Sequence, residues 1–170
     1  QWEGIRLLPY EGAATYTGDL RDPHLSIRPS DGSMMLTVAA HIYKSGVSQG
    51  VQPLAYFSKD MVNWGDHYPL GLPGKGWLWR TEWYGTTPYN FKYAGGNYLM
   101  SSATGGTTFT TSVGGVHQPG PNANETGFCF NGPQMVALMR FDGTDKNARV
   151  GFSNAPFTSF LWYNTGIQIG

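Results

Sequence analysis

Glycine and proline recur along the whole chain, and their density limits what the chain can fold into. Of 170 residues, 24 are Gly and 11 are Pro, and both residue types interrupt regular helices. The longest stretch without either, residues 33–45, alternates and carries β-branched residues, as a strand does. Hydrophobic residues make up 40% of the chain, which is enough for a core. The sequence therefore predicts one all-β domain over residues 1–170.

The charges are balanced. Eleven Lys and Arg residues face eleven Asp and Glu residues, with no run of either sign. Because no basic face can be built against phosphates, we expect no nucleic-acid partner. No apolar stretch reaches the roughly twenty residues that cross a bilayer, so we expect no membrane partner either.

The chain has a single cysteine, Cys129, so no disulfide can form within it. The neighbours Phe128 and Phe130 are large and apolar. We therefore expect Cys129 to occupy a buried strand position.

The clearest hairpin pairs His24–Arg28 with Ser33–Tyr43 across the turn residues 29–32, Pro-Ser-Asp-Gly. Both faces of the second strand are largely apolar, as expected for a strand that lies between neighbouring sheets. A polar loop, Lys44–Gly50, is expected next. It precedes a third strand around Pro53–Phe57.

This pattern recurs twice along the chain. The recurrences give three units of approximate extent 20–70, 77–115 and 122–165. Small meandering sheets repeated in this way favour a β-propeller, in which each sheet is a blade that packs on the next. A β-sandwich is the alternative that periodicity leaves open.

Several short motifs carry a family likeness. Residues 18–23, Gly-Asp-Leu-Arg-Asp-Pro, open the first unit, and 58–64 has the form Ser-x-Asp-x-x-x-Trp. A Trp-Leu-Trp-Arg segment follows at 77–80, and Asn124-Glu125-Thr126 precedes Arg140. Together they resemble the sialidase (neuraminidase) superfamily of Asp-box propellers, in particular uncharacterised exo-α-sialidase-like proteins. The resemblance implies about three four-stranded antiparallel blades of a six-bladed array, the N-terminal half of such a domain.

The resemblance also implies roles for individual residues. Arg21 and Arg140 match two of the three arginines that bind the carboxylate of an acidic sugar such as sialic acid. Glu125 matches the carboxylate that activates a tyrosine nucleophile. The loop at 44–50 lacks the aspartate that acts as general acid in the family, and His41 on the preceding strand is a candidate proton donor in its place.

Two other interpretations remain open. Furanosidase-type propellers have a similar opening, and in them Asp22 would act together with Glu125 or Glu82 on either side of a glycosidic bond. Alternatively, the domain binds a glycan and catalyses nothing.

Aromatic residues crowd around two charged ones in the second unit. Trp77, Trp79, Trp83 and Tyr84 surround Arg80 and Glu82. Aromatic faces beside polar groups suit sugar rings, and core packing explains them equally well. The substrate-binding candidates of this segment are Arg80, Glu82, Trp83 and Tyr84.

The four histidines lack the short spacing of metal ligands, so we expect no metal and no cofactor. The expected partner is a carbohydrate, either an acidic sugar or a larger glycan. Open blade edges lead us to expect self-association. A glycan-directed protein of this kind is expected to be secreted or periplasmic, although the residues themselves leave the compartment open.

Overall fold

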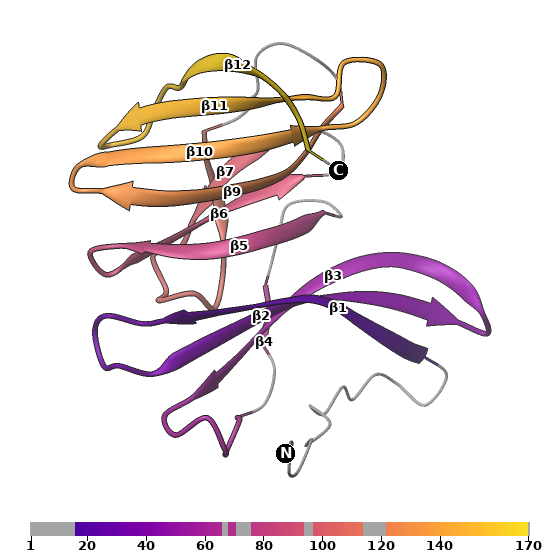
Figure 1. Cartoon of the computed structure of the whole chain (residues 1–170). Helices are drawn as coiled ribbons and strands as arrows, with labels where there is room; N and C mark the ends of the chain where they lie inside the picture. Colours follow the sequence, from indigo (N-terminus) through magenta and orange to yellow (C-terminus); the bar gives the residue numbers. More distant parts are fainter. Residues whose placement is uncertain (1–15, 66–67, 71–75, 94–96, 114–121, 170) are drawn as a thin grey trace, which may run out of the picture.

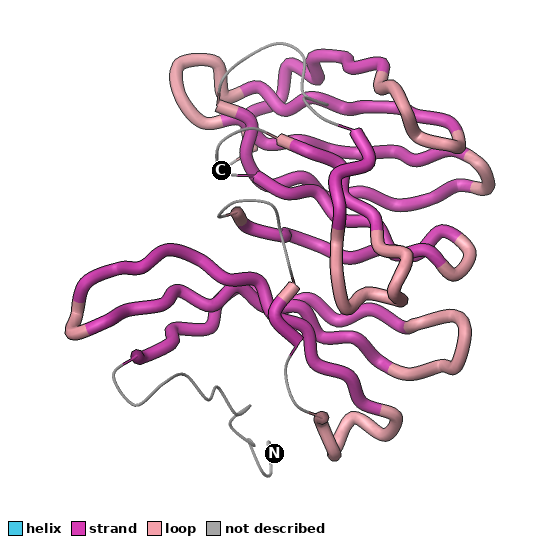
Figure 2. The backbone as a smooth tube through the Cα atoms, turned by 180° about the vertical axis from the view of Figure 1, so that it is seen from behind, coloured by secondary structure: helices cyan, strands magenta, loops and turns pink. Residues whose placement is uncertain are grey.

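The chain folds into strands. The computed structural model describes residues 16–65, 68–70, 76–93, 97–113 and 122–169, and within these ranges there are twelve strands and no helix (Figure 2). The prediction of an all-β fold is confirmed. Among the described residues, no helix has the length and hydropathy needed to cross a membrane.

The twelve strands form three four-stranded antiparallel sheets that follow one another along the chain (Figure 1). The first sheet contains β1 (Tyr16–Ile27), β2 (Met34–Lys44), β3 (Val47–Ser58) and β4 (Tyr68–Pro69). The second contains β5 (Trp77–Tyr84), β6 (Thr87–Tyr93), β7 (Tyr98–Ser101) and β8 (Thr110–Val113). The third contains β9 (Ala123–Asn131), β10 (Gln134–Phe141), β11 (Asn147–Asn154) and β12 (Leu161–Gln168). In each sheet the strands lie in sequence order, so every sheet is a meander.

The hairpin predicted around residues 29–32 is present. The Oδ1 atom of Asp31 accepts hydrogen bonds from the backbone N–H and the hydroxyl of Ser33, at 3.0 and 2.6 Å. Gly32 adopts a φ of 69°, a left-handed conformation that glycine reaches without steric cost. The turn pairs Ile27 with Met34. The strand before it begins at Tyr16, eight residues earlier than predicted.

The prediction of a polar loop at 44–50 is wrong. Strand β2 continues to Lys44, and β3 begins at Val47. Only Ser45 and Gly46 connect them, with φ of 49° and 77°. Two consecutive residues with positive φ make a tight turn whose twist matches that of paired strands, so the polar residues extend a hairpin.

The segment 58–64 forms a closed turn after β3. The Oδ1 atom of Asp60 accepts hydrogen bonds from the backbone N–H groups of Val62 and Asn63, at 2.9 and 2.7 Å. The indole N–H of Trp64 donates to the carbonyl of Met61 at 3.2 Å. The hydrogen bonds that Asp60 accepts from Asn63 and Val62 are the main reason that its pKa lies well below the usual range.

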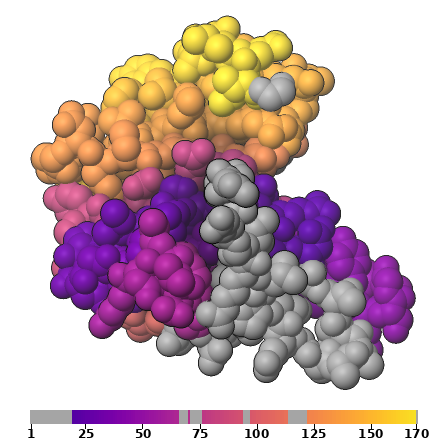
Figure 3. All heavy atoms as spheres, turned by 60° about the horizontal axis from the view of Figure 1, so that its bottom comes forward, coloured from indigo at the N-terminus to yellow at the C-terminus, as the bar shows by residue number. Residues whose placement is uncertain are grey.

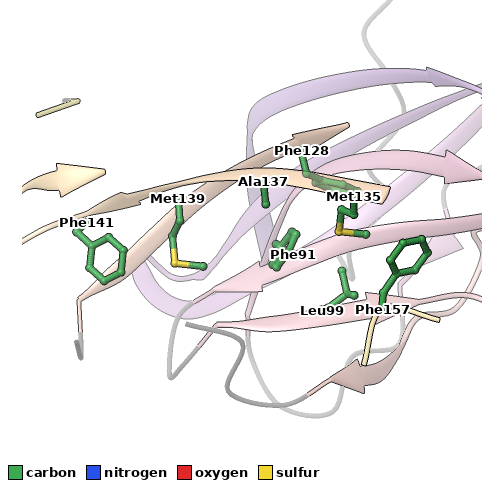
Figure 4. Packing of buried hydrophobic residues seen from close by; sticks show 8 residues of the cluster. All are labelled: Phe91, Leu99, Phe128, Met135, Ala137, Met139, Phe141 and Phe157. Atoms are coloured by element: carbon green, nitrogen blue, oxygen red, sulfur yellow. The ribbon is translucent and has the colours of Figure 1, made fainter. Parts of the chain in front are cut away.

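Consecutive sheets bury apolar side chains between them. The cluster between the first and second sheets consists of Met35, Ala55, Leu70, Leu78, Met100 and Phe109. The cluster between the second and third consists of Phe91, Leu99, Phe128, Met135, Ala137, Met139, Phe141 and Phe157 (Figure 4). Face-to-face packing of sheets is therefore how this chain builds its core.

The prediction that Cys129 is buried is wrong, because its thiol is exposed. Phe128 is 8% exposed and belongs to the cluster between the second and third sheets, and Phe130 packs against the same cluster. Successive residues of a strand point to opposite faces. Two inward-facing phenylalanines therefore place the cysteine between them on the outer face.

The first strands of the three sheets run in the same direction, side by side. The ring N–H of His24 on β1 lies 3.2 Å from the carbonyl of Thr81, and two residues further on the indole of Trp83 donates to Ser26 at 3.1 Å. Strand β5 also contacts β9, where the rings of Tyr84 and Phe130 lie 5.3 Å apart. The three sheets thus advance in one direction, and within the described residues they do not close into a ring.

Candidate functional site

All three sheets are irregular where their first two strands pair. The register of β1 against β2 shifts between Arg21 and His24, and that of β5 against β6 shifts between Leu78 and Thr81. The third shift lies at Arg140 on β10, opposite β9. Irregularities of this kind release side chains from the sheet's alternation and are common beside functional sites. Several predicted site residues lie in or next to these shifts: Arg21, Asp22, Arg80, Glu125 and Arg140.

Asp22 has an unusual backbone at its bulge. Its φ is 51°, in the left-handed region that few residues other than glycine enter. Aspartate tolerates this region better than most residues because its short side chain can bond locally. The bulge exposes Asp22 at the first strand of the first sheet.

A pocket of about 360 Å³ lies where the second and third sheets meet. Its lining residues come from β5, β9 and β10 and from the chain end: Trp79, Arg80, Glu125, Gly127, Leu138, Arg140 and Ile169. The pocket combines an indole face, two guanidinium groups, a carboxylate and aliphatic side chains. Its volume lies within the range of small-molecule sites.

The two predicted residues Glu125 and Arg140 meet in this pocket. One guanidinium nitrogen of Arg140 donates to Glu125 at 2.9 Å, and the other donates to Asp142 at 2.9 Å. Asp142 also accepts a hydrogen bond from the side-chain amide of Asn124. Arg140 therefore already has two carboxylate partners.

An aromatic group continues from the pocket toward the first sheet. Tyr93 on β6 stacks on Trp77 at 5.8 Å and meets Trp79 edge-on at 6.4 Å. Burial is the main cause that raises the pKa of the Tyr93 phenol, and the charges of Glu125 and Asp22 raise it further. Tyr93 is therefore within electrostatic range of carboxylates from both the first and the third sheets.

His41 packs behind this aromatic group. Its ring lies 4.9 Å from that of Trp77, edge-on, and its Nε2 atom is buried without a hydrogen-bond partner. The structure places His41 on the face of β2 that is turned toward the second sheet. Its proposed part in proton transfer stays a prediction.

Glu82 is half-buried, and its Oε1 atom lies 3.7 Å from the Nε2 atom of His24. Burial raises the pKa of Glu82 and is also the main cause that lowers the pKa of His24. In both cases burial stabilises the neutral form of the side chain relative to its charged form. Glu82 is thus a carboxyl group whose surroundings favour the protonated state.

Six predicted site residues do not line the pocket: Asp22, His41 and Glu82, described above, and Arg21, Trp83 and Tyr84. Arg21 is exposed and pairs with Asp19, at 2.6 Å. Trp83 packs against the cluster between the first and second sheets, and Tyr84 packs against the one between the second and third. The structure therefore gives both aromatic residues contacts in the core.

Sequence reasoning missed Tyr93 and Asp142. Asp142 follows Arg140 by two residues, and that spacing along a strand places both side chains on one face. The sequence could therefore have predicted that Asp142 lies beside Arg140. Tyr93 gave no such signal, because its place beside Glu125 depends on how two sheets pack.

The described residues hold no group of three or more His, Cys, Asp or Glu side chains that could bind a metal ion. The polar groups of the pocket are instead the guanidinium groups of Arg80 and Arg140 and the carboxylate of Glu125, beside an indole face. Such a set binds by hydrogen bonding and stacking.

No family model matches the chain, and no curated protein matches it either. A solved structure is similar in fold, the crystal structure of a protein of unknown function from Dyadobacter fermentans DSM 18053. The two share 18% sequence identity with a TM-score of 0.69, over 88% of this chain and 51% of the other. This chain therefore corresponds to about half the length of that protein.

The predicted membership of the sialidase superfamily is corrected by these findings. No family model supports it, the similar structure has no known function, and the three sheets do not form a closed propeller. The motifs that suggested it are short turn and strand-opening signals, which many β-sheet proteins use for local reasons. What the comparison shows is an all-β fold shared with a protein of unknown function.

Proposed function

We propose that the pocket between the second and third sheets binds a carbohydrate. The observation that carries the proposal is the convergence of Trp79, Glu125 and Arg140 from three strands on one pocket of about 360 Å³. An indole can pack against the C–H face of a sugar ring, while the carboxylate and the guanidinium bond its hydroxyls. A ring with hydroxyls at its edge uses both kinds of contact at once.

The ion pairs favour a neutral sugar over an acidic one. Arg140 is already engaged with Glu125 and Asp142, both at 2.9 Å. A sugar carboxylate bound to Arg140 would have to displace one of these partners and would meet the charge of the other. A hydroxyl can instead donate to the carboxylates and accept from the guanidinium without breaking the network.

The binding experiment is a glycan array followed by titration calorimetry on the strongest ligand. Trp79→Ala should weaken binding at least tenfold, because the stacking face is lost. Trp64→Ala is the matched control, since Trp64 lies in the turn after β3 and is not among the pocket residues. Equal affinity of wild type and Trp79→Ala, or binding only by acidic sugars, would contradict the proposal.

Hydrolysis of a glycoside is the second candidate function. Asp22 and Glu125 both lie within electrostatic range of Tyr93, and Glu82 has a raised pKa that suits a proton donor. A carboxylate and a carboxylic acid on either side of a glycosidic bond are the groups this reaction needs. Chromogenic glycosides test it: Glu125→Gln or Glu82→Gln should abolish turnover while the variants still bind the glycoside. A wild type that hydrolyses none of these substrates would contradict hydrolysis, and carbohydrate binding would remain as the proposed function.

The arrangement of the sheets supports a finer proposal about the fold. The first strands of three successive meanders lie side by side and run the same way, as strands nearest the axis of a radial array do. The similar solved structure is about twice as long as this chain. We therefore propose that the three sheets are consecutive members of such an array. Sheets that continue the array in an experimental structure would support it, and a sandwich would contradict it.

A further inference from the structure

Three polar side chains around Trp79 have no hydrogen-bond partner among the residues that the structure describes. Asp22 on β1 and Arg80 on β5 are exposed, and neither side chain makes a hydrogen bond or an ion pair within that part of the chain. The hydroxyl of Tyr93 on β6 has no such partner either, and it is not one of the buried polar atoms that lack one. These three groups can therefore bond a ligand without first losing a partner.

The ion pair on the third sheet is in the opposite condition. Arg140 donates to Glu125 and to Asp142, and Asp142 also accepts from the side chain of Asn124. A ligand can bond this network only beside the bonds that it already makes. The unpaired groups offer their whole hydrogen-bonding capacity, so they are the better candidates for contacts that set the choice of ligand.

The packing of the first strands places Asp22, Trp79 and Glu125 in one row. The contact between His24 on β1 and Thr81 on β5 is followed two residues later by another between the same strands, so the two strands advance in step. Counted back two residues from this contact, Asp22 stands at the level of Trp79, where both strands have their irregularity. Trp79 and Glu125 in turn line the same pocket. The row thus crosses all three sheets.

Tyr93 connects the two ends of this row. Its ring meets that of Trp79 edge-on at 6.4 Å. After burial, which is the largest cause, the charges of Glu125 and Asp22 both raise the pKa of its phenol. One side chain of the second sheet is therefore near a carboxylate of the third sheet and a carboxylate of the first. Figure 3 shows the order of the sheets along the molecule, from indigo to yellow.

The row is longer than one sugar ring. Packed sheets lie about 10 Å apart, so a row that runs from the first sheet over the second to the third extends over roughly 20 Å. A single ring that packs on Trp79 occupies the pocket and does not reach the carboxylate of Asp22. A ligand that uses both ends of the row must be a chain.

We propose that the ligand is a neutral oligosaccharide and that Asp22 and Tyr93 form a second subsite for it. One sugar unit packs on Trp79 in the pocket, where Arg80 is the unpaired donor. The next unit lies toward the first sheet, between the carboxylate of Asp22 and the hydroxyl of Tyr93. This inference rests on the proposed carbohydrate binding by the pocket and names the class of carbohydrate.

The hydrogen-bonding capacity of the three groups matches sugar hydroxyls. An ionised carboxylate only accepts, a guanidinium only donates, and a phenol does both. A hydroxyl also does both, so each unit of a neutral chain can bond any of the three. An acidic unit beside Asp22 would meet a second negative charge, which disfavours a charged chain.

Titration calorimetry with sugars of increasing length tests the proposal. The probes are neutral gluco-, manno-, xylo- and arabino-oligosaccharides of one to four units. For the series that binds, affinity should rise at least tenfold between one unit and the length that reaches Asp22, about the net contribution of one or two hydrogen bonds. Longer chains should add little, because the row ends there.

Two variants show where the gain comes from. Asp22→Asn should cancel most of it, so that the loss of affinity is larger for the longer chains than for the single unit. Tyr93→Phe removes only the hydroxyl and should act in the same way, with unchanged thermal unfolding because that hydroxyl bonds no other described residue. Asp31→Asn is the matched control, since Asp31 lies in the turn after β1 and is not among the pocket residues.

The outcomes separate this inference from the proposed function. Measurable binding whose affinity does not depend on length would overturn the second subsite and leave the pocket as a site for one sugar unit. An equal loss for all lengths in Asp22→Asn would do the same. If none of the neutral sugars binds at any length, both proposals are wrong. Trp79→Ala should weaken binding at every length, because the unit in the pocket is common to all of the ligands.

Discussion

His24 on the first sheet lies 3.7 Å from the carboxyl oxygen of Glu82 on the second, and the pKa of each is shifted in the direction that favours its neutral form. Burial is the main cause of both shifts. The contact joins the first strands of two sheets, so its protonation state bears on how the sheets pack.

Acidification should destabilise the protein through His24. The folded-state pKa of His24 is lowered, so below about 6.5, its ordinary value, the unfolded state binds the proton more tightly. This contribution to stability is present above that value and is lost as the pH falls toward the folded-state pKa. The raised pKa of Glu82 has the opposite effect on stability. Its contribution is present below about 4.5, its ordinary value, and is lost as the pH rises toward the folded-state pKa.

Urea unfolding between pH 5 and 7.5 measures this effect. His24→Gln keeps a side-chain donor for the carbonyl of Thr81 and does not titrate, so its stability should vary less over this interval than that of the wild type. Identical pH profiles of the two proteins would show that His24 has no part in the loss.

The ion pair in the pocket should couple Glu125 and Arg140. The Arg140 side chain is 35% exposed and that of Glu125 is 22% exposed, so solvent screens the interaction only in part. We expect a coupling free energy of about 1 kcal/mol from a double-mutant cycle of Glu125→Gln and Arg140→Met, measured by urea unfolding. Additive effects of the two substitutions would mean that the pair contributes nothing to stability.

Gly151 should be intolerant of a side chain. A Cβ atom there would lie 2.4 Å from the ring of Trp162, which packs across it from β12. Gly151→Ala should destabilise the protein by about 1–3 kcal/mol, because the indole must move. Gly127→Ala is the control: Gly127 is also in a strand, and nothing lies within 4 Å of its Cβ position. Equal thermal stabilities of the two variants would contradict this reasoning.

The cluster between the second and third sheets should dominate stability. Phe91 is fully buried and meets Phe128 and Phe160 edge-on at 5.2 and 5.8 Å. Phe91→Ala should cost about 3–5 kcal/mol through lost burial and a residual cavity. Val62→Ala, at an exposed position, should change stability by less than about 0.5 kcal/mol. A small effect at Phe91 in chemical unfolding would mean that the two sheets unfold separately.

The sequence predicts the strands of this protein better than its site. Alternation and the turn at 29–32 correctly predicted the first hairpin, because both are local signals. The expected loop at 44–50 was wrong because polar residues in a long two-stranded ribbon look like a loop. Cys129 was placed in the core although two flanking phenylalanines should have placed it outside.

The site depends on packing that local patterns do not specify. Glu125 and Arg140 lie on paired strands of one sheet, so fifteen residues of separation could be bridged by a hairpin. Their meeting with Trp79 needs two sheets in contact, and the direction of Arg21 depends on its nearest partner, Asp19. Those relationships follow from the way the sheets stack.

Strands β1, β5 and β9 run in the same direction, so the openings of the three sheets lie at the same end of the stack. The openings of β5 and β9, together with β10, supply residues to the pocket between the second and third sheets. Exchange of one meander for another would alter a single wall of the pocket, and the remaining walls would keep their shape. In the proposed carbohydrate site, such an exchange would change the ligand preference through one sheet at a time.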